Sequence, residues 1–339
     1  MKITINDVAK LAGVSIKTVS RVMNNEPSVR KDTFDKVSAA MKQLQYQPNA
    51  AARNLASSRS YSIGYVYDNP NAYYVIDMQR GLLDACRKHG YELLIHPTNA
   101  KATDIVQEVL DLVERSRLAG LVLTPPFSEM PDIAQALDQA GVEYVRIISG
   151  STPSPKLKNC VLIDDFTAAF KITNHLLELG HTAIAFLCGD EEHSSSGERL
   201  AGFQAALAKR GLTVPADFIV PGSYSFESGV KGANKLLSLN AKPSAIFACN
   251  DEIAAGALFS ARLKSISIPQ QLAIAGFENS PFSRQTWPPL TTAHQPNTTI
   301  AMQAAELLFK HTKPGQQANL AERQPVFIPE LVVRESTSG

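Results

Sequence analysis

The sequence predicts a mixed α/β protein, in which a small N-terminal three-helix domain precedes a two-lobe core of doubly wound parallel sheets. Residues 1–48 show only helical spacing of apolar side chains, whereas short apolar runs alternate with helical stretches from Tyr61 onward. About ten such runs are too many for one sheet of ordinary size. With 339 residues the chain also exceeds one ordinary core, so we expect two or three domains.

Charge is unevenly distributed along the chain. Residues 1–60 hold ten Lys/Arg and four Asp/Glu, and the remainder holds 23 and 28, so a net charge of +1 conceals +6 followed by −5. A basic head on a mildly acidic body suits contact with phosphates. No apolar run reaches the ~18 residues that span a membrane, and the polar N-terminus does not resemble a signal peptide. We therefore expect a cytoplasmic protein without a membrane partner.

The four cysteines are far apart and form no C-x-x-C pair. They are expected to be small buried groups rather than disulfides or metal ligands. No cofactor or metal is expected.

The stretch Thr4–Asn25 predicts two short helices joined by a tight turn. Thr4 and Asp7 have the spacing of a capping box, Gly13 suits the turn, and Ser15 can cap the second helix. Apolar groups at helical spacing give the two helices a buried side: Val8, Leu11, Ala12, Val19 and Val22. Ile16, Lys17 and Arg21 are left on the outer side. This is the helix-turn-helix arrangement, whose second helix enters the DNA major groove, although any small helical hairpin is an alternative.

A third helix is expected from about Asp32 to Leu44, after a loop that contains a proline. Its apolar positions can close a three-helix core: Phe34, Val37, Met41 and Leu44. Ser28, Arg30 and Lys31 lie near its start, where backbone N–H groups and positive charge favour a phosphate. A solvated face is the alternative for the two cations.

The opening stretch, with Tyr46-Gln47-Pro48-Asn49 and Ala52-Arg53-Asn54-Leu55-Ala56, closely resembles the LacI/GalR family of bacterial transcription regulators. The resemblance implies that residues 50–56 form a hinge helix, which orders when a dimer sits on its operator. It also implies that Leu55 is a wedge in the minor groove. Residues 57–60 are expected to be linker. A plain flexible linker throughout is the alternative.

The resemblance further implies a homodimeric repressor on a near-palindromic operator. Its DNA-contacting positions would be Thr4, Ser15, Ile16, Lys17, Thr18, Ser20, Arg21, Asn24, Arg30, Asn49, Ala52, Arg53 and Leu55. Lys17 is expected to donate to guanine, Ile16 to touch a thymine methyl, and Arg21 to contact a base or a phosphate. Backbone phosphates would be held by Lys2, Arg30, Lys31 and Arg53.

The core is expected to alternate strands and helices. Expected strands are Ser62–Tyr67, Tyr91–His96, Gly120–Leu123, Val142–Ile148, Cys160–Ile163, Thr182–Leu187, Ala245–Ala248 and Leu272–Gly276, and expected helices include 74–89, 103–117, 167–179, 198–210 and 250–263. We assign about 61–160 and 292–323 to lobe 1, and about 161–289 and 324–335 to lobe 2. Together 61–339 would form a periplasmic-binding-protein-like core that binds an effector and dimerises, with 1–48 and 49–60 as DNA-binding domain and hinge. Residues 336–339 are expected to be disordered.

Catalysis is not expected, because the sequence contains no nucleophile elbow, P-loop, dinucleotide fingerprint or H-E-x-x-H. Asp164-Asp165 and the acidic run 190–192 could hold a metal, but surface charge is the commoner explanation.

Ligands of such sheets sit beyond the strands' carboxyl ends. The effector-binding positions that the resemblance implies are Tyr73, Tyr74, Asp77, Arg199, Tyr224, Asn250 and Glu278, with Asp164, Asp165 and Ser196 as weaker candidates. Arg199 could bind two sugar oxygens, Asn250 could hydrogen-bond the ligand, and Tyr224 could stack on it.

Glu278 departs from the family, which usually has Asp there, so the ligand could sit differently. A sugar or glycoside acting as inducer is expected. The alternatives are a corepressor-dependent regulator that binds a purine or a phosphorylated metabolite, and a sugar receptor without DNA function. The purine alternative stays open because the purine-binding branch of the family also uses aromatic residues beyond the first strand, where this chain has Tyr73-Tyr74. A dimer is preferred to a tetramer, because the C-terminus is too short for an extra leucine-heptad helix.

Overall fold

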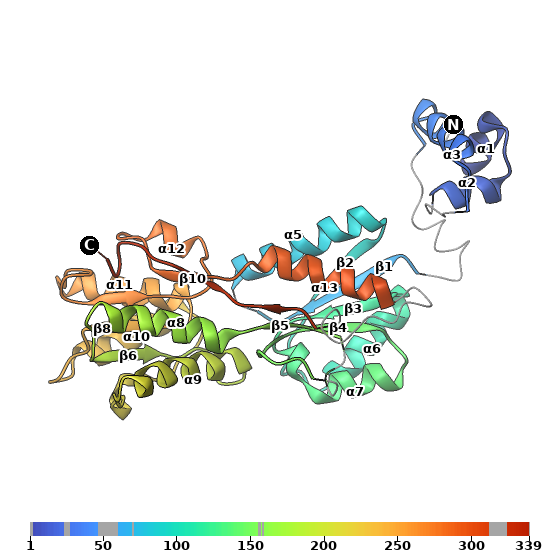
Figure 1. The fold of residues 1–339 in the computed structure, drawn as a ribbon. Helices are drawn as coiled ribbons and strands as arrows, with labels where there is room; N and C mark the ends of the chain where they lie inside the picture. Colours follow the sequence, from blue (N-terminus) through green and yellow to red (C-terminus); the bar gives the residue numbers. More distant parts are fainter. Residues whose placement is uncertain are drawn as a thin grey trace. The chain divides into compact units, whose positions relative to one another are not determined.

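The computed structural model describes residues 3–23, 28–46, 60–69, 71–154, 157, 159–311 and 324–338. The chain divides into two compact units, Met1–Tyr61 and Ser62–Gly339. Figure 1 shows the helices of the first unit and the layered helices and strands of the second.

The first unit contains the helices α1 (Ile5–Ala12), α2 (Ile16–Met23) and α3 (Lys31–Gln43). The predicted caps are present: the Thr4 N–H donates to the Asp7 carboxylate at 2.8 Å, and the Ser15 hydroxyl accepts the Thr18 N–H at 3.2 Å. Gly13 ends α1 with φ of +65°, a left-handed conformation that glycine adopts at no steric cost. The two-helix motif is therefore confirmed as local structure.

The core of this unit is small. Val8, Val19 and Val37 are completely buried, and Met41 and Leu44 pack against them. Phe34 was expected in this core, but 37% of it is exposed. The buried residues of α3 are instead Val37 and Ala40, so Phe34 lies outside the face that packs on α1 and α2.

The second unit consists of two lobes, and lobe 1 is built on a six-stranded parallel sheet with the order β11-β5-β4-β3-β1-β2. Its strands are β1 (Ser62–Tyr67), β2 (Glu92–Pro97), β3 (Gly120–Leu123), β4 (Tyr144–Ser149), β5 (Cys160–Ile163) and β11 (Val326–Phe327). Its helices are α5 (Ala72–His89), α6 (Ile105–Ser116), the short η1 (Phe127–Glu129), α7 (Pro131–Gln139) and α13 (Asn297–His311). Helices α5 and α13 pack on one face and α6 and α7 on the other, so the sheet is doubly wound.

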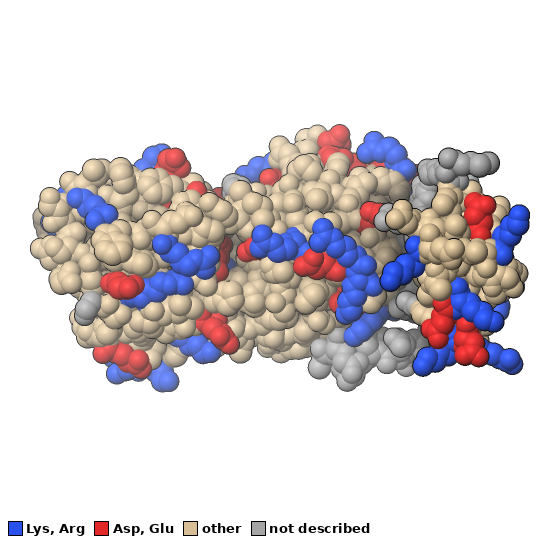
Figure 2. Space-filling model, turned by 90° about the horizontal axis from the view of Figure 1, so that it is seen from above, with Lys and Arg blue, Asp and Glu red and all other residues tan. Residues whose placement is uncertain are grey.

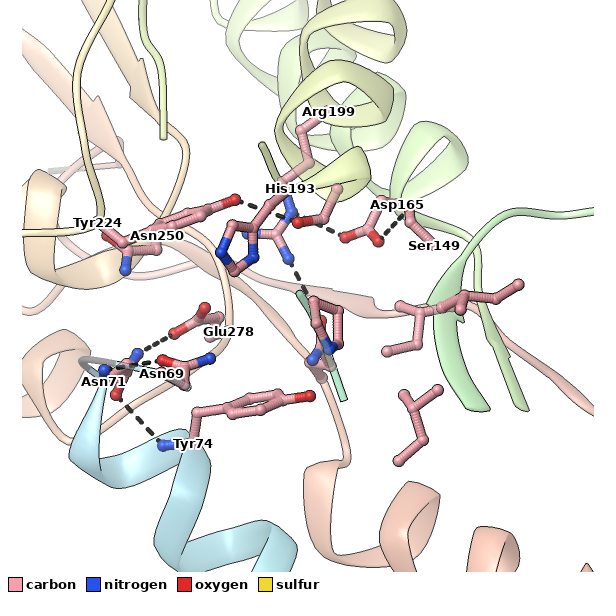
Figure 3. A pocket seen from close by; sticks show the side chains of 16 residues that line it. Asn69, Asn71, Tyr74, Ser149, Asp165, His193, Arg199, Tyr224, Asn250 and Glu278 are labelled. Atoms are coloured by element: carbon pink, nitrogen blue, oxygen red, sulfur yellow. Dashed lines mark hydrogen bonds and ion pairs between the residues drawn. The ribbon is translucent and has the colours of Figure 1, made fainter. Parts of the chain in front are cut away.

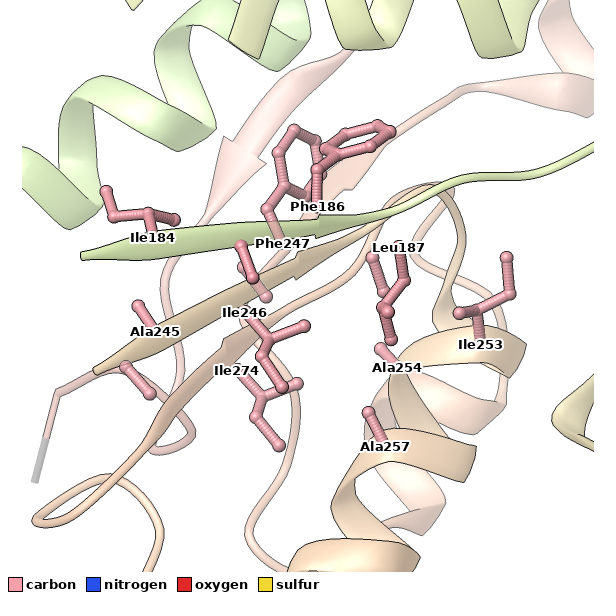
Figure 4. Packing of buried hydrophobic residues seen from close by; sticks show 14 of the residues in the cluster. Ile184, Phe186, Leu187, Ala245, Ile246, Phe247, Ile253, Ala254, Ala257 and Ile274 are labelled. Carbon is pink, nitrogen blue, oxygen red and sulfur yellow. The ribbon is translucent and has the colours of Figure 1, made fainter. Parts of the chain in front are cut away.

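Lobe 2 repeats this plan on a four-stranded parallel sheet with the order β7-β6-β8-β9. Its strands are β6 (Ile184–Leu187), β7 (Ile219–Val220), β8 (Ala245–Ala248) and β9 (Ala273–Ala275), and its helices are α8 (Asp165–Glu178), α9 (Ser194–Lys209), η2 (Ala216–Phe218), α10 (Phe226–Leu237), α11 (Asp251–Leu263) and α12 (Phe282–Gln285). Figure 4 shows Phe186 and Phe247 on one face of this sheet, and Leu187 facing Ile253 and Ala254 of α11 on the other. The buried strands are apolar throughout, as parallel strands covered on both faces must be.

Strand pairing moves the lobe boundaries from the predicted positions. The range 161–163 was assigned to lobe 2, but β5 pairs with β4, so lobe 1 extends to Ile163. The range 326–327 likewise belongs to lobe 1, because β11 pairs with β5. Strand β10 (Thr292–His294) pairs with β12 (Glu330–Val332) and is bridged to lobe 2 through Glu278. The boundaries could not be read from the sequence, because apolar strands of both lobes have the same composition.

Residues 336–338 are ordered, contrary to prediction. Ser336 is fully buried, and its N–H donates to the Pro289 carbonyl at 3.0 Å. The Thr337 hydroxyl lies 2.6 Å from the Thr291 hydroxyl. Small polar residues at a chain end suggested disorder, but here their hydrogen bonds attach the C-terminus to lobe 2.

Three cysteines, Cys86, Cys160 and Cys249, are buried, as predicted, and Cys188 is half-buried. Among the described residues, no helix is both long and apolar enough to cross a membrane.

Candidate functional site

The outer face of α2 is accessible to a partner. Ile16 is 49% exposed, and Lys17 and Arg21 are exposed beside it, whereas Val19 and Val22 are buried on the inner face. Thr18 and Ser20 are half-buried, and the Thr18 hydroxyl lies 2.9 Å from that of Ser15. Arg30 is exposed directly before α3, and Thr4 is exposed before α1.

The remaining predicted DNA-contacting residues lie outside the described part of the chain: Lys2, Asn24, Asn49, Ala52, Arg53 and Leu55. The hinge helix thus stays a prediction. Figure 2 shows charged side chains of both signs on the visible faces of the N-terminal unit and of the core.

A cavity lined by both polar and apolar side chains lies between the two lobes, beyond the carboxyl ends of their strands (Figure 3). Its lining consists of Asn69, Asn71, Tyr74, Pro125, Ile147, Ile148, Ser149, Ile163, Asp165, His193, Ser195, Arg199, Tyr224, Asn250, Glu278 and Gln295. Five of the seven predicted effector-binding residues are therefore brought together. The cavity measures about 50 Å³, well below the roughly 300 Å³ at which small-molecule pockets begin. A ligand must therefore part the lobes to enter.

Tyr73 and Asp77 are placed elsewhere, contrary to prediction. They line a separate cavity of about 40 Å³ on the far side of Tyr74 and Glu278, which line both cavities. The Asp77 side chain is 41% exposed and pairs with Arg80 at 3.4 Å. The helix explains the error, because successive residues of α5 point about 100° apart and only Tyr74 faces the main cavity.

Arg199 is buried in α9 and largely occupied by the protein itself. Its Nε donates to Asp165 Oδ1 at 2.8 Å, its Nη1 donates to the Cys249 carbonyl at 2.7 Å, and its Cζ lies 3.7 Å from the centre of the Phe277 ring. A third nitrogen, Nη2, reaches Gln295 at 3.5 Å. Burial opposes the charged form of Arg199, but Asp165, together with weaker contributions from Tyr224, Cys249 and Glu278, outweighs it and raises the pKa of Arg199. Of the five guanidinium N–H groups, three are thus committed, which leaves two for a ligand.

Asp165 links this arginine to the other lobe. Its Oδ2 accepts the hydroxyl of Ser149, at the end of β4 in lobe 1, at 2.6 Å. Asp164 is also buried and caps α8 by accepting the Thr167 N–H at 2.9 Å. The interpretation of this pair as surface charge is therefore wrong. Within the described residues, no group of three or more His, Cys, Asp and Glu side chains could hold a metal.

Asn250 combines the two roles that the sequence left open. Its Oδ1 caps α11 by accepting the Ile253 N–H at 2.9 Å. Its Nδ2 is buried at the cavity and has no hydrogen-bond partner among the described residues. A buried unpaired donor is unfavourable by about 1–3 kcal/mol, so this amide favours a ligand that brings an acceptor.

Glu278 spans the cavity. Its Oε2 accepts the Asn71 Nδ2 at 2.8 Å, from the start of α5 in lobe 1, and Figure 3 shows the two side chains facing each other. Its backbone has φ of +98°, a left-handed conformation uncommon outside glycine. Burial raises the pKa of Glu278 to about 8, although Arg199 opposes the rise. The extra methylene of glutamate thus serves a contact between the lobes.

Tyr224 forms the lobe 2 wall. Its hydroxyl lies 2.8 Å from Ser196 Oγ and 3.2 Å from Ser195 Oγ, and burial raises its pKa well above the usual value. A Cβ atom at Gly189 would overlap the tyrosine ring, so this close approach requires glycine. Ser196 therefore positions Tyr224 and does not itself line the cavity.

Several lining residues were not predicted: Asn69, Asn71, Pro125, Ile147, Ile148, Ser149, Ile163, His193, Ser195 and Gln295. Asn69, Pro125, Ser149 and Ile163 lie at or just beyond the carboxyl ends of β1, β3, β4 and β5. Applied to every lobe 1 strand, the rule that located Asn250 and Glu278 would have found them. Burial lowers the pKa of His193, so this side chain is neutral near pH 7.

A two-helix DNA-reading motif joined to a two-lobe α/β core with a cavity between the lobes defines a ligand-controlled DNA-binding regulator. The model of bacterial regulatory proteins of the lacI family matches residues 4–49, and that of the periplasmic binding protein-like domain matches residues 173–337. The HTH-type transcriptional regulator DegA of Bacillus subtilis (strain 168) is 34% identical over 339 residues, with 100% of this chain and 99% of DegA covered. The chain belongs to the LacI family.

Other relatives agree with this assignment. The HTH-type transcriptional repressor PurR of Haemophilus influenzae (strain PittEE) is 31% identical, with 99% of both chains covered. The structure of a complex of the transcriptional regulator CelR with cellobiose is 26% identical, with a TM-score of 0.74 and coverage of 98% and 99%. The lac repressor dimer bound to operator and the anti-inducer ONPF has 24% identity, a TM-score of 0.79 and full coverage of both chains, and supports the fold alone. The protein is a DNA-binding transcriptional repressor and not an enzyme.

Proposed function

We propose that the protein is a homodimeric repressor whose operator affinity is controlled by a sugar or glycoside bound between the two lobes, with the sugar acting as inducer. Because bacterial operators lie in the cytoplasm, we place the protein there. One recognition helix α2 would enter each half-site of a near-palindromic operator, with Lys17 on guanine and Ile16 on a thymine methyl.

The cavity chemistry supports an uncharged polyhydroxyl ligand. Three charged residues line it, and two of these, Arg199 and Asp165, neutralise each other at 2.8 Å. Glu278 is the third, and because burial raises its pKa to about 8 it is mostly protonated near pH 7, so a phosphorylated metabolite would find no unpaired cation here. Hydroxyl groups can both accept from Asn250 Nδ2 and donate to Glu278. The complex of the relative CelR with cellobiose is consistent with this proposal.

A purine is the second candidate, and one observation favours it. Tyr74 lies on the lobe 1 side of the cavity, opposite Tyr224 on the lobe 2 side. Two aromatic side chains could hold a flat ring between them. A purine acting as corepressor would favour the operator-bound state, whereas an inducer would favour the other state.

We place the dimer interface at exposed apolar residues of lobe 2, which would contact a second copy of this chain. Leu263 at the end of α11 is 70% exposed, Phe259 one turn earlier is 45% exposed, and Trp287 is 72% exposed. Trp287 lines a groove together with Arg262 at the end of α11 and Ile266 just after it. Large apolar side chains that are exposed close together on a surface are typical of interaction sites. Leu263→Asp should convert a dimer to monomers in analytical ultracentrifugation, and a wild-type monomer would refute this surface.

The effector proposal is tested by isothermal calorimetry with a panel of sugars, sugar phosphates and nucleobases. Asn250→Ser keeps a residue that caps α11 but removes the unpaired amide donor, so it should weaken effector binding with little change in melting temperature. Wild-type affinity in Asn250→Ser, or in Arg199→Ala, would remove that residue from the site. Preference for a nucleobase over every sugar would replace inducer with the purine alternative.

The DNA side is tested by gel shift. Leu55→Ala should weaken specific operator binding while effector affinity stays nearly unchanged, because the wedge contacts only the minor groove. Unchanged operator binding would overturn the hinge proposal.

A further inference from the structure

Helix α9 of lobe 2 begins without a side-chain cap from its N-cap residue. The residue before it, His193, makes no side-chain capping bond. The N–H of Ser194, the first helical residue, instead donates to Glu129 Oε2 at 3.0 Å. Glu129 ends η1 in lobe 1. A carboxylate from one lobe thus satisfies a free N–H at the positive end of a helix in the other lobe.

The capped turn forms part of the wall of the effector cavity. His193 and Ser195 line the cavity at this turn, and Arg199 follows just over one turn later. Ser195 and Ser196 also hold the Tyr224 hydroxyl. The order of this turn therefore determines the shape of the lobe 2 side of the cavity.

Glu129 itself does not line the cavity, and its surroundings suit a contact between the lobes. Its Oε1 is buried without a hydrogen-bond partner among the described residues. Removing a carboxylate from water is unfavourable, so burial raises the pKa of Glu129, and the hydrogen bond from the Ser194 N–H opposes this rise. The neighbouring contact between the lobes, from Lys101 Nζ to Glu192 Oε1 at 3.2 Å, has side chains 73% and 66% exposed and contributes little.

We propose that Glu129 is an interlobe latch, which caps α9 only while the lobes are closed. A separation of the lobes by little more than 1 Å at this point lengthens the 3.0 Å bond beyond hydrogen-bond range. Closure of the lobes and the order of the effector-facing turn are therefore coupled. The latch is independent of the chemical class of the effector, because Glu129 does not line the cavity.

Hydrogen exchange of the full-length protein without ligand, measured by mass spectrometry over residues 194–198, tests the latch. Glu129→Ala should raise exchange there about fivefold, the usual effect of losing a helix cap. Glu114→Ala is the matched control, because Glu114 is an exposed acid on α6 of the same lobe. It should leave exchange over 194–198 unchanged.

Asn71→Ser separates a latch from an ordinary cap. Asn71 Oδ1 accepts the Tyr73 and Tyr74 N–H groups at 3.1 and 3.2 Å, a role that serine can fill, but serine is too short to reach Glu278. This variant loosens closure from the opposite side of the cavity and should also raise exchange over 194–198. Unchanged exchange in Glu129→Ala would remove the cap. If exchange rises in Glu129→Ala but stays at the wild-type level in Asn71→Ser, Glu129 caps α9 whether or not the lobes are closed, and the latch proposal is wrong.

Discussion

Replacing Glu278 with Gln should remove a large pH dependence of stability. Burial raises the pKa of Glu278 from 4.5 to about 8. Between pH 4.5 and 8, the folded protein therefore keeps a proton on Glu278 that the unfolded chain has already released. Stability from this group is greatest at low pH and falls as pH rises through that window, with a limiting slope of about 1.4 kcal/mol per pH unit. Between pH 6 and 8 the free energy of unfolding of the wild type should fall by about 2 kcal/mol more than that of the variant.

Glutamine suits this comparison because its carbonyl can still accept the Asn71 amide, so the contact between the lobes is retained. Asp251, whose pKa burial raises to about 7, titrates in both proteins, so its contribution largely cancels in the difference. Urea unfolding of both proteins at half-unit steps from pH 5.5 to 8.5, followed by far-UV circular dichroism, gives the two profiles. Parallel profiles would show that Glu278 is not a buried proton-binding group.

Three further changes follow from other parts of the structure. Asp165→Ala leaves Arg199 buried without its partner and should lower the free energy of unfolding by about 3–5 kcal/mol in urea melts; a change below 1 kcal/mol would mean that the ion pair is solvated. Val37→Ala removes a fully buried side chain from the three-helix unit and should lower that unit's stability by about 2 kcal/mol, measured by calorimetry, while the melting of the core stays unchanged. Arg30→Ala should weaken binding to operator and random DNA alike and reduce the dependence of log affinity on log salt by about one, measured by fluorescence anisotropy; an effect confined to operator would assign Arg30 to base reading.

The sequence predicts much of the fold, because the signals are local. Strands β1, β3, β5 and β8 have the predicted bounds, since apolar runs between breakers define buried parallel strands directly. The two-residue β7 and β11 escaped prediction, because each forms only where an existing strand offers an edge. The buried C-terminus escaped for the same reason: Ser336 is held by partners 47 and 62 residues away in the chain, Pro289 and Ile274.

The sequence predicted which residues line the site better than it predicted the contacts that those residues make. The sequence and the family resemblance pointed to Arg199, Asn250 and Glu278, but not to the groups that occupy them. The partner of Arg199 is Asp165, which looked like surface charge, and the partner of Glu278 is Asn71, which the sequence did not single out. Both contacts depend on how the lobes approach each other, which pattern and spacing do not encode.

The contacts that close the cavity determine what an effector must do. Asn71 with Glu278 and Ser149 with Asp165 connect the lobes through the same side chains that face the cavity. A ligand that enters must replace these bonds with its own, and it shifts the equilibrium between states only by the difference. Affinity and switching therefore share residues. A substitution at Asn71 or Ser149 should change operator release as well as effector affinity. A substitution of a residue that contacts only the ligand should change effector affinity alone.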